Sequence, residues 1–542
     1  MNGNTGISLR QFNMVWVILL LALVVRLPGL LFGVKLSAWP VAVHGFRSLH
    51  IDEENLARIA HGFIDREDLG VIRYPKGFPV QMALAAFLTA RAAKPYLFHF
   101  ILIGRCLSLL YGIATVLVLY CLATEIFAKK TISLLAGLFL ALAGLHVTES
   151  HYATADAGNT FWIYATILFC LWAIRKKDIF LCLAVITGGY AIAFKFSVAV
   201  LVPIIYVLIL QKKDIRYWIL VGLAIFSVFT LANGGWYPLS TFRSLFEGRV
   251  ADQPTLTLHY NSLINPLAYF VQLLPAVGLP IFISFFLAFR SFHFKKFHED
   301  KNLRDVFFVL ILPILLYYVI VCFVSIPFPR YPFSRHLLVG IPLFVLVAAY
   351  GSVRWVERIK WGGEKRLLHK VVALFIVYQL IFVGQIEYYF VFDTITSSEK
   401  WVRTHIPPTK KIAAFCWMWP KFEFKNKVTW LSPKSRYRPF LFLHETSFFR
   451  YLRSPLNLFD KFPSWTEIYH GNYFHFIFVQ ALFKDQLPYA LVKKFEVKAI
   501  TPEMFLYKKI WGTFPLFLGD VLIYRKVEAP KHRDGGLGSP IT

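Results

Sequence analysis

Long apolar runs, separated by short connections rich in lysine and arginine, dominate this chain. Of its 542 residues, 57% are hydrophobic and only 16% are charged, unlike a soluble globular domain. A helix needs about 20 mostly apolar residues to cross a bilayer. The runs of suitable composition cover residues 14–34, 98–127, 131–147, 157–174, 179–194, 197–211, 216–232, 267–290, 305–326, 336–350 and 370–391. They predict a polytopic α-helical membrane protein with about eleven spanning helices.

The basic clusters predict how these helices are oriented. The net charge is +27, but the lysines and arginines lie between apolar runs and not on one continuous face, which argues against nucleic acid as a partner. The clusters occupy every second connection, at residues 129–130, 175–177, 212–213, 290–304 and 354–370. The positive-inside rule places them in the cytoplasm. The connections expected to face outward are 35–97, 148–156, 233–266, 327–335 and everything after about residue 392.

Three segments do not fit a spanning helix. Residues 78–90 are too short to span, and we interpret them as a half-buried interfacial helix. Residues 392–530 predict a small extracytoplasmic α/β domain, in which "SSEKWVRTHIPPTKKIAAF" gives a helix and then a strand. The segments "YFHFIFVQ", "ALVKKFEVK" and "GDVLIYRK" have strand length. Residues 531–542 predict a disordered tail.

An acidic triplet stands out in the first outward connection. In "HIDEENLARIAHGF", apolar residues recur at helical spacing, so we expect a surface-lying amphipathic helix that begins near Asp52. Asp52, Glu53 and Glu54 would occupy its first turn, where acidic side chains complement the helix dipole. Carboxylates at a lipid boundary are costly unless they are paired, hydrated or bound to a cation, so they are also functional candidates.

The second outward connection, "HVTESHYATADAGNTFW", carries further acidic residues. Glu149 and Asp156 bracket it, and His146 and His151 lie close in sequence. Asp156 precedes an apolar run and could simply cap that helix, a role compatible with catalysis. Two outward connections would therefore bring carboxylates to one face of the membrane.

Cationic residues map to the same side. They are Lys195 in "AIAFKFSV" and Arg330, Arg335 and His336 in "PFPRYPFSRHLL". Charge-assisted contacts from such side chains would bind a phosphate, although each could also snorkel to the headgroups. Arg26 and Arg105 lie within apolar runs and predict partners inside the bundle.

The stretch "RYPKGFPV" contains Tyr74 and Lys76, which could line an acceptor groove. The alternative is a rigid loop that sets the direction of the next helix.

Taken in order, the motifs resemble a known family. His50, Asp52 and Glu53 form H-x-D-E, followed by "YPKGFP", "SHYATAD", "GGYAIAFKFS" and "DTITSSEKWVRTHIPPTKKI". Together they resemble the polytopic GT-C glycosyltransferases of family 39, which include the protein O-mannosyltransferases and are similar to the aminoarabinose transferase of lipid A. The resemblance extends over about residues 10 to 420.

The resemblance implies a GT-C fold and inverting transfer of one sugar, a hexose or pentose, from a polyprenyl-phosphate-linked donor to a hydroxyl acceptor outside the membrane. By position, Asp52 is the expected general base, with Glu53 beside it, and Asp156 supports the site. Lys195 and Arg335 would hold the donor phosphate, and Arg330 and His336 are further candidates for this contact. Tyr74, Lys76 and His151 are candidates for the acceptor or its loop.

Cofactor and acceptor stay open at this stage. Members of the wider group differ in metal use, so a divalent cation such as Mg²⁺ or Mn²⁺ is an option, with Asp52, Asp156 and His50 as candidate ligands. The sequence has no evident β-trefoil insertion, which disfavours a protein acceptor relative to a lipid or glycan. We expect a multi-pass protein of a prokaryotic plasma membrane that acts in cell-envelope glycosylation, with membrane lipids as its surroundings.

Two other classes of function compete with this one. A transporter or flippase of a lipid-linked or anionic substrate would also place charges in a helical bundle, but such proteins usually show symmetry between halves and broken helices near mid-membrane. A scaffold protein would need far fewer helices, because one spanning helix suffices as an anchor.

Overall fold

The chain forms two compact units. The first comprises Met1–Val391 with Ile500–Met504, and the second comprises Phe392–Ala499 with Phe505–Thr542. The computed structural model describes residues 9–31, 51–65, 75–89, 97–235, 264–289, 301–319, 334–358, 364–415, 426–448, 473–506 and 519–527. The predicted disordered tail, 531–542, lies outside the described residues.

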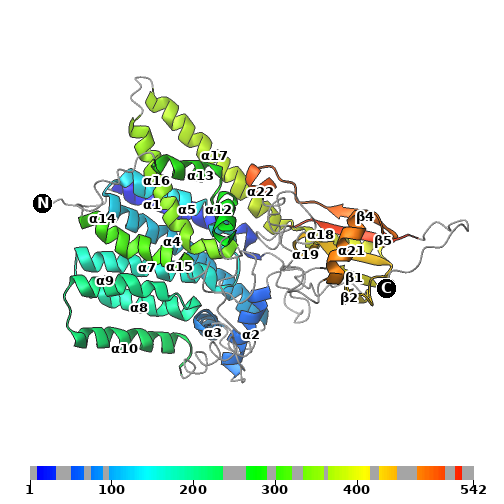
Figure 1. Ribbon diagram of the computed structural model, residues 1–542, viewed down its shortest axis with the longest axis horizontal. Coiled ribbons are helices and arrows are strands. Elements are labelled where there is room, and N and C mark those ends of the chain that lie inside the picture. The colour runs from blue at the N-terminus through cyan, green and yellow to red at the C-terminus, as the bar shows by residue number, and fades with distance from the viewer. Residues whose placement is uncertain are drawn as a thin grey trace, which may run out of the picture. The chain divides into compact units, whose positions relative to one another are not determined.

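The first unit is a bundle of helices (Figure 1). Its α-helices are α1 (Leu9–Val24), α2 (Ile51–Asp65), α3 (Gly77–Thr89), α4 (Leu97–Phe127), α5 (Lys130–Ala141), α6 (Gly144–Glu149), α7 (Ala155–Arg175), α8 (Ile179–Lys195), α9 (Leu201–Leu210), α10 (Ile215–Ala232), α12 (Ile264–Val277), α13 (Leu279–Phe289), α14 (Lys301–Val306), α15 (Leu312–Val319), α16 (Ile341–Arg358) and α17 (Glu364–Val391). A π-helical stretch, Phe307–Ile311, joins α14 to α15. A 3₁₀ helix, Ser334–Gly340, precedes α16.

Seven of the described helical segments are long and apolar enough to cross a membrane. They are Asn13–Leu31, Leu97–Phe127, Ala155–Arg175, Ile215–Ala232, Asn302–Val319, Arg335–Arg358 and Val372–His405. A helix satisfies every backbone group internally, which is the condition for crossing lipid. The predicted multi-pass helical fold is therefore confirmed.

Three of the expected spans are shorter helices. The apolar helices Lys130–Ala141, Ile179–Lys195 and Val198–Leu210 each have 10–17 residues, less than a straight crossing needs. The expected run 131–147 also divides into α5 and α6 near Ala143, where the backbone is extended. The figure of about eleven spans therefore exceeds the seven or eight that length and composition support within the described residues.

Helix α10 shows what the bundle's outer surface is made of. Only 11% of this 18-residue apolar helix is buried inside the protein. Its exposed large hydrophobic side chains are Ile215, Tyr217, Ile219, Leu220, Leu223, Phe226 and Leu231. Water-soluble proteins rarely expose a continuous apolar surface of this kind. The α10 surface is thus suited to contact lipid.

Within the expected span 267–290 the described residues form two helices that meet at a sharp bend. Tyr269–Val277 and Leu279–Ala288 are bent by 118° at Gly278, which has a φ of +94°. An L-residue rarely adopts that φ, and Pro280 suits the first turn of the following helix. The carboxylate of Glu503, in the returning helix α22 (Pro502–Leu506), accepts the Leu279 backbone N–H at 2.6 Å. The break is therefore built into the fold.

We expect Gly278→Ala to lower the unfolding temperature of the detergent-solubilised protein. A Cβ there would strain the backbone and collide with the Gln379 amide, which is held by the carbonyls of Leu142 at 2.7 Å and Val277 at 2.6 Å. The cost should be about 2 kcal/mol or more. Gly384→Ala is the control, because a Cβ at this helical position meets nothing within 4 Å. Equal unfolding temperatures for the two variants would contradict the argument.

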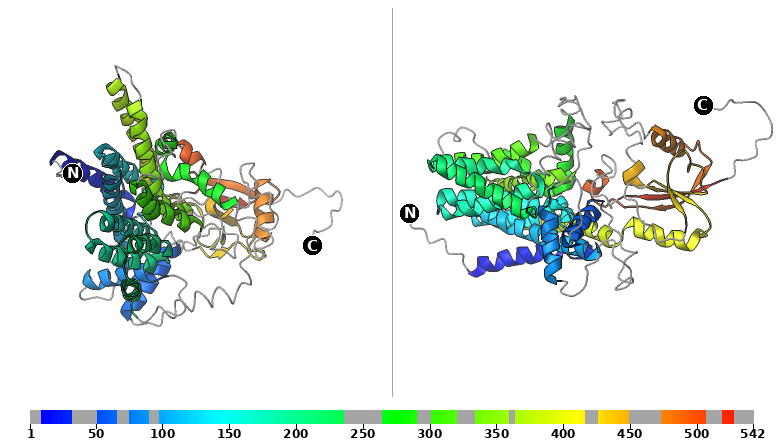
Figure 2. Two further views of the ribbon diagram at one scale, coloured as in Figure 1. Left: turned by 60° about the vertical axis from the view of Figure 1, so that its left-hand side comes forward. Right: turned by 90° about the horizontal axis from the view of Figure 1, so that it is seen from below.

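Helices α7 and α8 form an antiparallel pair near the centre of the bundle. They pack against each other, α7 also packs on α4, and α10 covers α8. The group is visible in Figure 1, and in cyan and green from two further directions in Figure 2. Because α7 and α8 are consecutive and antiparallel, the first turn of α7 and the last turn of α8 lie at the same end of the bundle.

Helices α2 and α3 pack on α4 at this end. The apolar side of α2, including Leu56, Ala57 and Ala60, joins Phe78 and Met82 of α3 in one buried cluster. The predicted helix beginning near Asp52 is confirmed. The described part of the expected helix 78–90 lies in α3 (Gly77–Thr89), which is buried on one side and exposes Leu84, Phe87 and Leu88 on the other. Its position at a membrane interface stays a prediction.

The second unit is a five-stranded mixed sheet with helices. The strands are β1 (Ile412–Phe415), β2 (Val428–Trp430), β3 (Phe440–His444), β4 (Tyr489–Phe495) and β5 (Val521–Lys526), and their order in the sheet is β2-β1-β3-β5-β4. Strand β1 is parallel to β2 and β3, whereas β5 is antiparallel to β3 and β4. The helices that the structure describes in this unit are α18 (Thr394–His405), α19 (Glu445–Phe448) and α21 (Tyr473–Phe483). The predicted α/β fold is confirmed.

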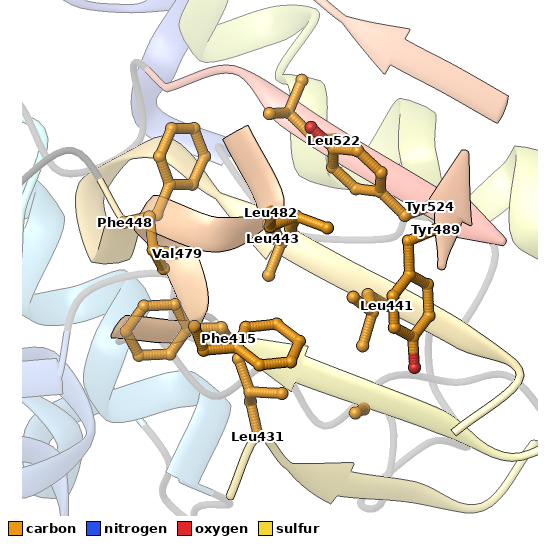
Figure 3. Packing of buried hydrophobic residues seen from close by; sticks show 12 residues of the cluster. Phe415, Leu431, Leu441, Leu443, Phe448, Val479, Leu482, Tyr489, Leu522 and Tyr524 are labelled. Carbon is orange, nitrogen blue, oxygen red and sulfur yellow. The ribbon is translucent and has the colours of Figure 1, made fainter. Parts of the chain in front are cut away.

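Successive side chains of β3 point to opposite faces of the sheet, and both faces are buried. Leu441 and Leu443 point to the face where Val479 and Leu482 of α21 pack (Figure 3). Successive strand residues point to opposite faces, so Phe442 and His444 are buried on the other side. The strand prediction for "YFHFIFVQ" is wrong, because this stretch begins α21. A short apolar run fits a buried helix as well as a strand, and packing on the sheet selected the helix.

Candidate active site

Asp52 and Glu53 are neighbours in the first turn of α2, but their side chains have different surroundings. Successive residues of a helix point about 100° apart. Glu53 is completely buried, and its carboxylate forms a two-pronged ion pair with Arg105 of α4 at 2.8 and 2.9 Å. It also accepts the backbone N–H of Ala153 at 2.7 Å. Glu53 therefore joins α2 to α4 and to the connection before α7.

Asp52 instead takes part in a partly exposed ion pair. Its carboxylate pairs with the guanidinium of Arg335 in the 3₁₀ helix Ser334–Gly340, and about a quarter of each side chain is exposed. The two residues are 283 positions apart in the sequence. Only tertiary structure brings this pair together.

Asp156 and Lys195 form a second carboxylate–cation pair. Asp156 lies in the first turn of α7 and Lys195 is the last residue of α8, so each charge also complements its helix dipole. Phe196, in the left-handed conformation with φ of +51°, ends α8 directly after the lysine. The N-cap of α7 is Thr154, so the alternative in which Asp156 caps this helix does not apply.

The two pairs belong to one electrostatic cluster. Asp156 interacts with Arg335 as well as with Lys195, and His336 is also within its reach. The ring of His336 is bonded through Nδ1 to the Tyr269 hydroxyl at 2.8 Å. The structure therefore gathers Asp52, Asp156, Lys195 and Arg335 from segments that the sequence keeps far apart.

Glu149, the last residue of α6, is part of this cluster, although the sequence alone assigned it no role in the site. It interacts with Asp156, Arg335, Lys195 and Asp52. Burial, and then the nearby Asp156, raises the pKa of Glu149 to about 8. Its signal in the sequence was its place in the same acidic outward connection as Asp156.

His151 and Lys76 lie in other surroundings. His151 is buried, with Nε2 3.2 Å from the Glu387 carboxylate and its ring stacked on Phe390 at 4.4 Å, so it faces α17. Lys76 is 2% exposed, and its ammonium lies 5.9 Å from the centre of the Phe63 ring. The described contacts of both residues suit packing between helices.

The predicted bundle-interior partners of the two buried arginines are confirmed. Arg26 donates to His146 Nδ1 at 2.8 Å and to the carbonyl of Ala141 at 3.0 Å. Arg105 has Glu53 as its partner. The remaining candidates, His50, Tyr74 and Arg330, lie outside the described residues.

The described residues do not form a metal site. No three His, Cys, Asp or Glu side chains among them come close enough together to hold an ion. Asp52 and Asp156 each pair with a cationic side chain instead.

A family model matches a stretch of the chain that contains part of this site. The model of dolichyl-phosphate-mannose-protein mannosyltransferase matches residues 97–236, which include Glu149, Asp156 and Lys195. No curated protein is similar enough in sequence to count as a match.

Three solved structures, of two proteins, are similar to this chain at low identity. The oligosaccharyltransferase of Archaeoglobus fulgidus, in complex with Zn and sulfate, is 12% identical, with a TM-score of 0.48 over 80% of this chain and 68% of its own. ArnT from Cupriavidus metallidurans in the apo state is 11% identical, with a TM-score of 0.49 over 81% and 94%. The same ArnT bound to undecaprenyl phosphate is 12% identical, with a TM-score of 0.46 over 83% and 95%. With its motifs and the family match over residues 97–236, the chain resembles the GT-C membrane glycosyltransferases.

Proposed function

We propose that this protein transfers one sugar from a polyprenyl-phosphate-linked donor to a hydroxyl group of a lipid, glycan or protein acceptor. The observation that carries this proposal is the clustering of two carboxylate–cation pairs, Asp52–Arg335 and Asp156–Lys195, in a bundle that resembles GT-C enzymes. Such a reaction needs a base for the acceptor and fixed positive charge for the departing phosphate. The cluster supplies both kinds of group.

The roles in this proposal follow from position. Asp52 is partly exposed and takes the proton of the acceptor hydroxyl as its oxygen attacks the anomeric carbon. The bond from that carbon to the phosphate oxygen breaks on the opposite face, so the configuration inverts. Lys195 and Arg335 then stabilise the negative charge of the released polyprenyl phosphate. Glu53, already engaged by Arg105, acts as a positioning residue for α2.

The outward orientation of the site is also part of the proposal. The basic clusters lie at the helix ends remote from Asp156 and Lys195, because Arg175 ends α7 and Asp178 directly precedes α8. Lys176 pairs with Glu125 near the end of α4, and Lys213 pairs with Asp178 at 2.8 Å. Under the positive-inside rule this end is cytoplasmic, so the cluster faces the other side.

A panel of polyprenyl-phosphate monosaccharides tests the function directly. We expect at least one donor to raise the unfolding temperature of the purified protein and to be consumed, with release of polyprenyl phosphate. If no donor binds or is consumed, transport assays in liposomes become decisive, because the helix broken at Gly278 also fits a transporter.

We expect Lys195→Met to weaken binding of undecaprenyl phosphate about 10- to 100-fold, because a charge-assisted hydrogen bond contributes roughly 1.5–3 kcal/mol. Calorimetry or a fluorescence titration measures the change. Lys213→Met is the matched control, since it removes a lysine–aspartate pair at the opposite end of α8. Equal weakening by both variants would show a general effect on the bundle and contradict the assigned contact.

A further inference from the structure

One of the two carboxyl oxygens of Glu149 is buried and unpartnered among the described residues. Its side chain ends α6, the residue is 5% exposed, and Oε2 has no hydrogen-bond partner among the described residues. An unpaired polar atom in a buried position costs stability unless a ligand satisfies it. This carboxyl oxygen is therefore available to a group that the described residues do not supply.

The charges around Glu149 determine its protonation state. Its charged neighbours are Asp52, Asp156, Lys195 and Arg335, which form two ion pairs whose charges cancel. Among the described residues, Lys195 and Arg335 are the cations that act on Glu149, and each already balances an aspartate, so a third carboxylate in this buried position is left unbalanced by them. With a pKa of about 8, Glu149 is mostly a neutral acid at pH 7 and becomes ionised as the pH rises through 8.

Other titratable groups on or near α6 are engaged elsewhere. His146 accepts a hydrogen bond from Arg26, and His151 lies beside Glu387. His336 bonds Tyr269. Tyr317 of α15 also faces Asp156 and Arg335. Glu149 is thus the carboxylic acid of this cluster that has an unpartnered oxygen among the described residues.

We propose that Glu149, as a neutral carboxylic acid, donates its O–H to an oxygen of the donor phosphate held by Lys195 and Arg335. This inference rests on the proposed function, because it assumes a phosphate at these cations. The other charges of the cluster cancel, so an ionised Glu149 repels an incoming anion. A protonated Glu149 instead donates a hydrogen bond to it. Above pH 8, binding of the donor must therefore take up one proton from solution.

The test uses the methyl ester of undecaprenyl phosphate. This phosphodiester resembles the donor linkage and stays singly charged between pH 6.5 and 9.5. Its affinity is measured across this range for the wild type, Glu149→Gln and Asp178→Asn. Asp178→Asn is the matched control, because it makes a carboxylate-to-amide change at the end of α8 that is remote from Lys195.

For the wild type we expect affinity to fall about tenfold per pH unit above pH 8, as linkage to one proton requires. Glu149→Gln should bind within about threefold of wild type at pH 7, since its amide still donates, and should hold that affinity to pH 9.5. Asp178→Asn should follow the wild type. A calorimetric measurement in buffers of different ionisation enthalpy should find about one proton taken up by the wild type at pH 9.

Two results would overturn the inference. If the wild type binds the probe with an affinity independent of pH and takes up no proton, Glu149 does not supply a hydrogen to the phosphate, while the proposed function stands. If Glu149→Gln keeps the pH dependence, another group carries the proton. The calorimetric measurement needs only the wild type, so the inference is tested even if the variant fails to fold. Absence of binding at every pH would instead remove the donor site on which both proposals rest.

Discussion

Asp52→Asn should reduce sugar transfer by about 10²- to 10⁴-fold, the usual contribution of a general base. The amide has the same shape, and its oxygen can still accept a bond from Arg335, so the fold should be retained. It cannot take the acceptor's proton at neutral pH. Turnover of the identified donor, measured as release of polyprenyl phosphate, checks the result, and binding of undecaprenyl phosphate should persist.

Glu54→Gln is the matched control for this prediction. Glu54 is in the same helical turn but pairs with Arg58 one turn later, at 2.5 Å on the surface of α2. Its loss should leave turnover within about twofold of wild type, because exposed pairs contribute little. Full activity of Asp52→Asn would remove Asp52 from the chemical step and contradict its assignment as the general base.

Glu53→Gln should mainly destabilise the protein. It leaves the Arg105 guanidinium, which is 1% exposed, without a balancing charge. Removing one partner of a buried pair costs roughly 3–5 kcal/mol. The unfolding temperature in detergent should fall clearly, measured at one heating rate because membrane proteins often unfold irreversibly. Glu54→Gln again serves as the control and should have the same unfolding temperature as the wild type.

The double variant Glu53→Gln, Arg105→Gln separates charge from packing. Because both charges are removed, it should recover part of the lost unfolding temperature. If Glu53→Gln melts like the wild type and loses transfer completely, Glu53 acts in the chemistry, and its proposed role as a positioning residue would be wrong.

The sequence by itself determined the class of protein and the segments that carry the acids. Apolar runs between basic clusters require a helical bundle in lipid, since only internally bonded helices leave no backbone group unsatisfied there. Charged residues in those runs, such as Arg105, predicted buried partners because an isolated charge in lipid is costly. Local patterns were enough for α2, α18 and β1, which have strong periodicity and clear ends.

Only the tertiary structure decided what each acidic residue does. Asp52 and Glu53 are adjacent in sequence, yet the helix turns one toward Arg335 and the other toward Arg105. The bend at Gly278 and the helix α21 likewise depend on Gln379, Glu503 and the sheet, which are distant in the chain. Glu149 gained its raised pKa from burial beside Asp156, a property of the packed bundle and not of any short stretch. Ion pairing and desolvation act over a few ångströms, and which residues come that close is set by how the helices pack.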